Sequence, residues 1–404
     1  MTKSSGTYLQ DNLEVIVERT SEDIQTLRPV WEEMQAKEPY PVINADIDRF
    51  LSVIEASNDR MEPYIILIKQ NDQPMAMVLA RLEMRPIKFE LGYKTLLSSK
   101  PKSLTIEYGG ILGQLDENLC SFLMEKLMKI SRDSGVDLIF FNHLRTDSSI
   151  FQLSRKIPGV LIRDNFPKFE KHWSMSAPKN LDQFYKKRSK NHRCNLKRCI
   201  RTLEKEYPNQ VQIITYTTED DLDEAIKAAS QISCSTYQHG LGCGFIDNPR
   251  TRILLTTAAR QNWLRMSILF INEEPGAFQI GLKYGKQYFM EQIGFAPKWG
   301  RLELGTVLFL KVLEQICADP DIEFVDFGFG DAHYKRRYGD KQWQEASVYI
   351  FAPRPYPIFI NMLLTLTSGL NIGLEYILKK MGLIGWIKRR WRNLLQKRSF
   401  ERDG

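Results

Sequence analysis

A short strand near the C-terminal end of the chain is followed by a dense group of ionisable side chains. The strand ends in Asp326-Phe-Gly-Phe-Gly330, and after it come Asp331, His333, Tyr334, Lys335 and Arg337. Ligands collect at the carboxyl ends of strands in α/β sheets. The group therefore predicts a functional site. Asp331, His333 and Tyr334 are its catalytic candidates, and among them the imidazole of a histidine is the kind of group that titrates near neutrality. Lys335 and Arg337 are its candidate anion binders.

A loop with two glycines precedes the apolar helix that we expect over residues 306–317. Gly300 and Gly305 permit close approach of the backbone to a ligand, and the first N–H groups of the helix are unpaired. Arg301 adds a positive charge, and Thr306 begins the expected helix. The loop predicts a binding site for an anion such as a pyrophosphate, against the alternative of a plain turn between strand and helix.

The strand expected over residues 287–295 precedes this loop and carries Glu291. Side chains alternate along a strand, so Phe289 and Glu291 are expected to share one face. A carboxylate in this place is a candidate general base, acting directly or through water. The alternative is an ordinary strand residue in a salt bridge. The sequence leaves open whether Glu291 or His333 is the base.

The elements that position these residues occur twice. A shift of 201 positions lays residues 65–80 on residues 266–281 without a gap, and Asn71 then falls on Asn272. Each expected hairpin leads into a strand, a glycine pair or loop, a helix and an apolar strand. We therefore expect two copies of one α/β unit. The charged-aromatic group occurs only in the second copy, which we expect to hold the active site.

Residues 186–205 are rich in lysine and arginine and are expected to form a helix. Cations at three- and four-residue spacing share one face of a helix, and this face carries Lys186, Lys190, Arg193, Lys197 and Arg201. The pattern favours an anionic acceptor such as a phosphosugar, a polysaccharide or a nucleotide-linked carrier, and a solvated helix is the alternative. Neither aromatic interleaving nor a known binding motif supports a nucleic-acid partner.

The composition is that of an ordinary soluble protein, with 404 residues of which 43% are hydrophobic and 26% charged. The length favours two domains. Six cysteines without metal-ligand spacing predict free thiols in a reducing cytoplasm and no metal site. The first ten residues lack the apolar stretch of a signal peptide, so we expect a cytoplasmic protein.

The C-terminal segment differs in character from the rest of the chain. Residues 358–374 carry no charge, and the basic residues that follow are interspersed with Trp386 and Trp391. Basic residues and tryptophans at helical spacing are typical of a helix on an anionic membrane surface. We expect such a helix here, and a tail packed on the body or a partner-binding helix is the alternative.

These features follow one another in the order of a known family. The ordered set comprises the basic helix start Arg188–Arg193, the strand end Gly294-Phe295, the Leu304-Gly305 turn, and Asp326–Asp331 followed by Tyr334–Gly339. The chain resembles the CelD/BcsL-type branch of the GNAT acetyltransferase superfamily, whose tandem halves are similar to the Fem peptidyltransferases. The resemblance covers residues 180–352 well and residues 14–175 in element order. Leu304 replaces the usual proline, and the usual phosphate loop survives only as Arg301–Thr306.

The resemblance implies an α/β fold of two tandem GNAT-like mixed β-sheet domains flanked by helices, over residues 12–176 and 177–354, with a basic helical extension over 355–404. It implies direct transfer of an acyl group from acetyl-CoA or another acyl-CoA to an amine of a sugar, polysaccharide precursor or related surface metabolite, without a metal. The loop would hold the pyrophosphate, the N–H group near Ile293 would stabilise the oxyanion, and Tyr334 would protonate the leaving thiolate.

Two other functions are consistent with the same sequence. The Fem relatives imply aminoacyl transfer from a charged tRNA, and the basic helix over residues 186–205 agrees with that function. A non-catalytic GNAT pair that scaffolds polysaccharide assembly agrees with the altered phosphate loop.

Overall fold

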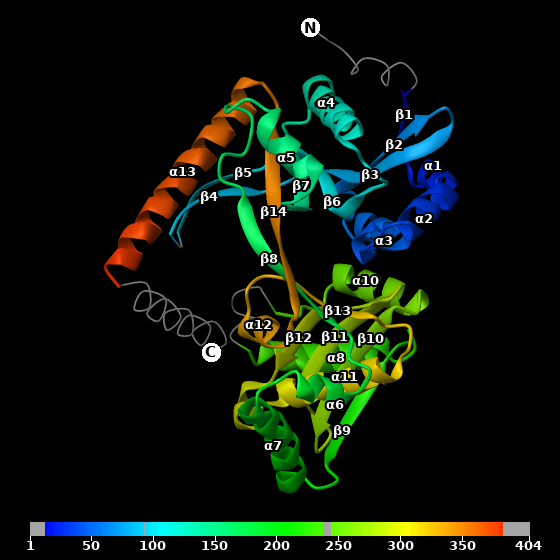
Figure 1. The fold of residues 1–404 in the computed structure, drawn as a ribbon, viewed down its shortest axis with the longest axis vertical. Helices are drawn as coiled ribbons and strands as arrows, with labels where there is room; N and C mark the ends of the chain where they lie inside the picture. Colours follow the sequence, from blue (N-terminus) through cyan, green and yellow to red (C-terminus); the bar gives the residue numbers. More distant parts are fainter. Residues whose placement is uncertain (1–12, 93, 237–243, 383–404) are drawn as a thin grey trace. The chain divides into compact units, whose positions relative to one another are not determined.

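The computed structural model describes residues 13–92, 94–236 and 244–382, which fall into two compact units (Figure 1). Among these residues, one unit comprises 13–170 and 343–382, and the other comprises 171–342. Each has a mixed sheet with helices on it, as the sequence predicts. The bounds differ from the expected segments, because the strand and helix after residue 343 pack with the first unit.

The first unit is built on a sheet in which β6 and β7 run parallel and the other neighbours antiparallel. Its strand order is β1-β2-β3-β6-β7-β14. Its elements are β1 (Leu13–Glu18), α1 (Ser21–Thr26), α2 (Arg28–Ala36), η1 (Ile43–Ala45), α3 (Ile47–Glu55), β2 (Met61–Gln70), β3 (Gln73–Met84), β4 (Ile87–Leu91), β5 (Lys94–Ser99), β6 (Lys102–Leu112), α4 (Glu117–Asp133), β7 (Leu138–Arg145), α5 (Ser149–Lys156), β14 (Lys341–Phe351) and α13 (Pro355–Lys380).

The second unit has the equivalent order β9-β10-β11-β12-β13-β8, with β12 and β13 parallel. Its elements are β8 (Lys168–Ser176), α6 (Leu181–Lys186), α7 (Lys190–Glu206), β9 (Val211–Tyr216), α8 (Leu222–Cys234), α10 (Pro249–Arg260), β10 (Leu264–Ile271), β11 (Glu274–Tyr284), β12 (Gln287–Phe295), η2 (Pro297–Leu302), α11 (Leu304–Ala318), β13 (Phe324–Phe329) and α12 (His333–Tyr338).

The internal repeat is visible in the two hairpins. Asn71 and Asp72 have φ angles of 50° and 62°, and Asn272 and Glu273 have 50° and 64°. Two consecutive residues with positive φ are the signature of a type I′ turn, whose twist suits a β-hairpin. Each hairpin also shifts register at the matching place, after Ile68 in one unit and after Leu269 in the other. The 201-residue correspondence therefore extends to the backbone.

Apolar side chains bury the helices against each sheet. In the second unit, α11 contributes Val307, Leu308, Leu310 and Leu313 to a core shared with Phe184 of α6. A helix that is apolar on most of its surface is expected to be enclosed, and this one is. In the first unit, separate cores form under α4 and α5 and under α1 to α3.

The helix α13 packs on the first unit from its N-terminal end as far as Asn371, whose amide donates to the carbonyl of Glu90 at 2.8 Å. Ile360 joins a core with Phe89 and Phe351, and the Asn361 amide donates to the carbonyls of Leu161 and Arg163, each at 2.9 Å. Among the described helices, α13 is long and apolar enough to span a membrane by length and composition, yet only 22% of its most apolar window is buried. Residues 383–404, with the tryptophans and most of the predicted basic cluster, lie outside the described part of the chain.

Candidate active site

The sheet of the second unit opens between its two parallel strands. β12 and β13 pair only over Gln287–Phe289, opposite Phe324–Asp326. Beyond that point, β12 continues to Phe295 beside β11, and β13 continues to Phe329 beside β8. The far end of β12 therefore has no strand pairing on the β13 side within the described residues.

A cavity of about 320 Å³ lies along the separated end of β12. It brings together seven residues predicted from the sequence, namely Ile293, Gly300, Gly305, Thr306, His333, Tyr334 and Arg337. Its other walls come from Gln279, Met290, Phe295, Glu303, Leu304, Phe309 and Tyr338. Met290 and Phe309 give no signal in the sequence, because apolar residues are ordinary in a strand and in an apolar helix. The walls are mostly apolar, with a few polar groups, as in sites for small organic ligands.

The start of α11 at this cavity is open to an anion. Glu303, the residue before the helix, has a left-handed φ of 50°, and its side chain does not cap the helix. The carbonyl of Glu303 accepts from the N–H groups of Thr306 and Val307, while those of Leu304 and Gly305 donate to no group in the described part of the chain. Unpaired N–H groups and the positive end of the helix dipole attract negative charge.

Of Arg301, Lys335 and Arg337, only Arg337 lines the cavity. The Arg301 guanidinium pairs with Glu206 of α7 at 2.6 Å and is 71% exposed. The Lys335 ammonium is buried and donates to the carbonyl of Phe329, so it holds the end of β13. The geometry therefore gives Arg301 and Lys335 partners within the protein rather than a place in the cavity.

Two tyrosines from α12 form the wall opposite β12. Burial raises the pKa of Tyr334 to about 12, so its hydroxyl keeps its proton at neutral pH. The Tyr338 ring stacks on Phe309 at 4.6 Å between centroids and on His192 of α7 at 6.0 Å. Burial also raises the pKa of Tyr338. Both phenols are thus protonated hydrogen-bond donors beside the cavity, and the side chain of His333 lines the same cavity.

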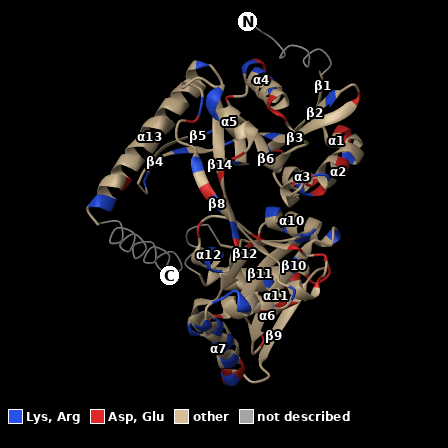
Figure 2. Ribbon diagram, in the orientation of Figure 1, with Lys and Arg blue, Asp and Glu red and all other residues tan. Residues whose placement is uncertain are grey.

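The remaining predicted site residues lie outside the cavity walls. A register shift between Ile280 and Gly281 leaves Glu291 as an extra, exposed residue on β12. The shift interrupts the regular alternation of side chains along β12, on which the prediction that Phe289 and Glu291 share one face depends. Asp331 is on the surface, paired with Arg336 at 2.9 Å. Lys190 and Arg193 stand in the first turn of α7, where lysine and arginine are dense (Figure 2).

The aspartate that begins the signature sequence is buried beneath the site. Asp326 accepts from His172 of β8 at 2.7 Å and from the N–H group of Gly328 at 2.6 Å. Both side chains of the pair are at most 2% exposed. Buried charges need such partners, because an isolated carboxylate is costly away from water. Asp326 therefore fixes the turn that leads from β13 into α12.

The comparisons with known proteins agree with this geometry. A family model described as "Acetyltransferase (GNAT) domain" matches residues 190–336. Residues 190–336 are therefore similar to a GNAT acetyltransferase domain. The match supports an acyltransferase activity, and the matched residues include β12 and β13, the start of α11 and the cavity walls up to the residue before Arg337. In the described residues, no group of three metal-binding side chains gathers.

The solved structures extend the GNAT likeness to both units. The crystal structure of FemX matches with a TM-score of 0.58 and 8% identity over 86% of this chain and 100% of that one. A tandem GNAT protein from the clavulanic acid biosynthesis pathway matches with a TM-score of 0.50 and 10% identity over 84% and 99%. These matches show a tandem GNAT fold. No protein in a curated set matches the sequence.

Proposed function

We propose that the second unit transfers an acyl group from acyl-CoA to an amine on a sugar, a polysaccharide precursor or a related surface metabolite. The open start of α11 at the cavity carries this proposal. The free N–H groups of Leu304 and Gly305, with Arg337, supply a positive place for a pyrophosphate. The apolar walls between Met290 and Phe309 would hold an uncharged pantetheine arm and acyl group.

The residues around the cavity suit direct transfer. The neutral amine would attack the thioester carbon, so that a C–N bond forms and the C–S bond breaks. His333 would take the proton from the attacking nitrogen, and the N–H group near Ile293 would stabilise the oxyanion. Tyr334 would give its proton to the thiolate and recover it from solvent. His333 replaces Glu291 as the preferred base, because only His333 lines the cavity.

Gly305→Asp is expected to weaken acyl-CoA binding about 100-fold. The new carboxylate would stand beside the bound pyrophosphate, and like charges about 6 Å apart repel by roughly 2–3 kcal/mol at an effective dielectric of about 20. A Cβ at Gly305 would meet only Phe295, at 3.6 Å, so the fold should accept it. Calorimetric titration with acetyl-CoA and free CoA measures the affinity.

The matched control is Gly305→Asn, which has the same shape without the charge. It should bind CoA within about threefold of the wild type. Equal losses in the two variants would contradict the anion site. If the folded wild-type protein binds neither acetyl-CoA nor CoA, the acyl-CoA proposal fails. Salt-dependent binding of aminoacyl-tRNA would then favour the aminoacyl transferase alternative. If aminoacyl-tRNA does not bind either, the non-catalytic scaffold would be favoured.

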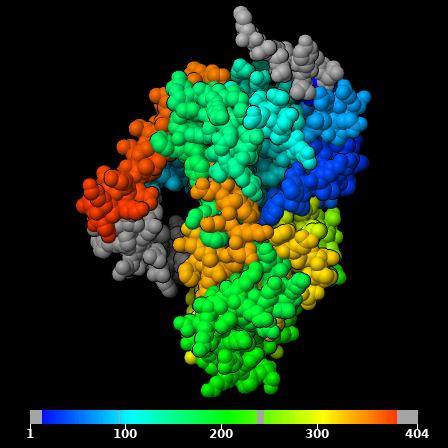
Figure 3. Space-filling model, in the orientation of Figure 1, coloured from blue at the N-terminus to red at the C-terminus, as the bar shows by residue number. Residues whose placement is uncertain are grey.

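We also propose that the protein works on the surface of an anionic membrane, held by α13. Large apolar side chains that are more than half exposed recur along this helix at Phe359, Met362, Leu366, Leu370 and Ile377, and Met381 follows its last residue. Figure 3 shows this outer side at the surface of the first unit, in orange and red. Lys379 and Lys380 end the helix with positive charge. An apolar face with a basic end suits the interface of anionic lipid.

Replacing Phe359, Leu366 and Leu370 together by glutamine is expected to lower vesicle binding at least about tenfold, since each buried apolar side chain contributes roughly 1–2 kcal/mol. Sedimentation with phosphatidylglycerol vesicles measures the bound fraction, and phosphatidylcholine vesicles test the charge dependence. Glutamine at the exposed Val17 of β1 is the control. Undiminished binding by the triple variant, or no wild-type binding to anionic vesicles, would contradict the proposal.

A further inference from the structure

The first unit has an opened sheet of its own. β6 and β7 pair in parallel over Ser103–Ile106, opposite Leu138–Phe141, and then part. A cavity of about 450 Å³ lies at this place, larger than the one in the second unit. Its walls come from β6, β7, the start of β14 and the segment between α2 and η1. The two units thus have equivalent cavities, and their linings can be compared.

The helix start at the first cavity is closed to an anion. The Asp116 carboxylate caps α4 by accepting from the N–H group of Leu119 at 2.8 Å, and Glu117 adds a second acid in the first turn. In the second unit, the matching helix has no side-chain cap and no acid in its first turn. Carboxylates at this end of a helix occupy the place of a phosphate and repel it. The first cavity is therefore unsuited to CoA.

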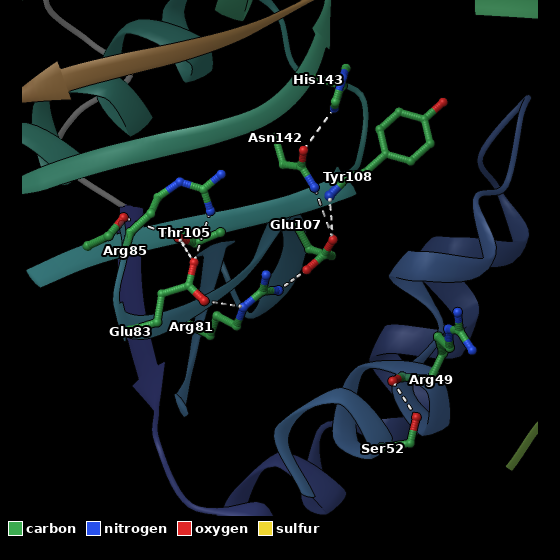
Figure 4. A network of polar contacts seen from close by, with 11 residues as sticks. Arg49, Ser52, Arg81, Glu83, Arg85, Thr105, Glu107, Tyr108, Asn142 and His143 are labelled. Atoms are coloured by element: carbon green, nitrogen blue, oxygen red, sulfur yellow. Dashed lines mark hydrogen bonds and ion pairs between the residues drawn. The ribbon is translucent and has the colours of Figure 1, made fainter. Parts of the chain in front are cut away.

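Three carboxylates from separate elements line the first cavity. Glu107 is 9% exposed and is held by the Arg81 guanidinium and by the Asn142 amide at 3.3 Å (Figure 4). Glu345 is 1% exposed and accepts from Trp343 at 2.5 Å. Glu38 accepts from the N–H group of Gly113 at 2.8 Å and makes no ion pair in the described part of the chain. Burial raises the pKa of Glu38, a penalty that a bound cation would relieve.

The cations at this cavity already have acidic partners. Arg145 pairs with Asp147 at 2.7 Å while its guanidinium stays 5.5 Å from the Trp343 ring. His143 lies between the Asn142 carbonyl oxygen and Glu170, at 2.8 Å from each. Glu107 is paired with Arg81, and Glu345 interacts electrostatically with Arg145, so Glu38 is the lining carboxylate that makes no ion pair in the described part of the chain.

Aromatic rings complete the cavity walls. Tyr40 meets Trp343 edge to face at 5.5 Å, and Tyr108 meets His143 edge to face at 6.2 Å. The faces of such rings attract cations, and their edges enclose apolar groups. Carboxylates beside aromatic rings form the usual surroundings of a bound ammonium group.

The backbone conformation at His143 is a further point on which the two units can be compared. His143 has a φ of 58°, and Gly328, the residue two places after the last paired position in the second unit, has a φ of 67°. Glycine adopts this conformation freely, whereas a histidine there is strained by about 1 kcal/mol or more. The first unit accepts that strain and places an imidazole where the second unit has no side chain.

We propose that the cavity of the first unit is a separate binding site for a small molecule that carries a protonated amine. Glu38 meets the ammonium group, and Tyr40, Tyr108 and Trp343 enclose the carbon frame. The site does not depend on the acyl transfer proposed for the second unit, because its residues belong to the first unit alone.

Calorimetric titration of the full-length protein tests this site with matched probes. The amine probes are glucosamine and cadaverine, and the neutral counterparts are N-acetylglucosamine and pentanediol. We expect saturable binding of an amine probe, weaker by about tenfold or more for its neutral counterpart, because a hydrogen-bonded charge contributes strongly when buried. Free CoA should not compete.

Two variants connect the binding to the cavity. Glu38→Gln keeps an oxygen for the N–H group of Gly113 but loses the charge, and Tyr40→Leu removes one ring; each should weaken amine binding about tenfold. Gly305→Asp, in the other unit, should leave it unchanged. The proposal is overturned if no amine probe binds, if neutral counterparts bind equally well, if CoA competes, or if both first-unit variants bind like the wild type. Circular dichroism checks that each variant is folded.

Discussion

His333→Gln is expected to lower kcat for N-acyl transfer by about 100- to 10,000-fold, the range that a positioned general base contributes. The imidazole lies on the cavity wall with Tyr334 and Arg337, within reach of an amine that approaches the separated end of β12. Glutamine keeps similar bulk and polarity but accepts no proton. Affinity for acyl-CoA should therefore stay within about threefold. Steady-state kinetics with the preferred acceptor, together with calorimetry, separates the two quantities.

The matched control is Glu291→Gln. Glu291 is the extra residue of the β12 register shift and its side chain is not part of the cavity wall, so kcat should change by less than about threefold. The opposite result, a large loss in the Glu291 variant and a small one at His333, would transfer the base role to Glu291. If the His333 and Glu291 variants both lose the same limb of the pH–rate profile, neither residue alone can be assigned as the base.

Asp326→Ala is expected to lower the free energy of unfolding of the second unit by about 3–5 kcal/mol, as for other buried pairs that lose one partner. The substitution leaves the His172 ring without its 2.7 Å partner and the N–H group of Gly328 without an acceptor. Urea denaturation followed by circular dichroism measures the loss, with the transitions of the two units analysed separately.

Asp326→Asn is the informative comparison. Its amide oxygen can still accept from Gly328, so the expected loss is only about 1–2 kcal/mol. If the free energy of unfolding of the alanine variant lies within about 1 kcal/mol of the wild-type value, the pair does not hold the turn, and the aspartate would need another role.

The repeat and the glycine loop could be predicted from the sequence, because local chemistry determines them. Asn71 and Asn272 fall in equivalent turns, and Gly305 stands at the start of α11. The cluster after β13 was also predicted, but the directions of its side chains were not. Arg301 turns to Glu206 and Lys335 to the carbonyl of Phe329. Those partners are far away in sequence or on the backbone, and no spacing rule reveals them.

Two features depend on strand pairing and were missed. The register shift between Ile280 and Gly281 makes Glu291 an extra residue on β12. The faces of the residues around it therefore cannot be predicted from the alternation of side chains alone. The cavity of the first unit joins Glu38, Glu107 and Glu345 from three distant segments. No motif connects them, so the sequence predicts chemistry in the second half alone.

The pairing of β14 has a consequence for the synthesis of this chain on the ribosome. It pairs with β7 from Arg145 to Leu138, although it follows β7 by about 200 residues in the chain. At about 5–20 residues per second, a ribosome needs roughly 10–40 s to make that interval. Throughout it, the edge of β7 has no permanent partner and can pair with another nascent chain. The first half of this protein is begun early and finished last, so the cell must shield an open sheet edge while the second half is being translated.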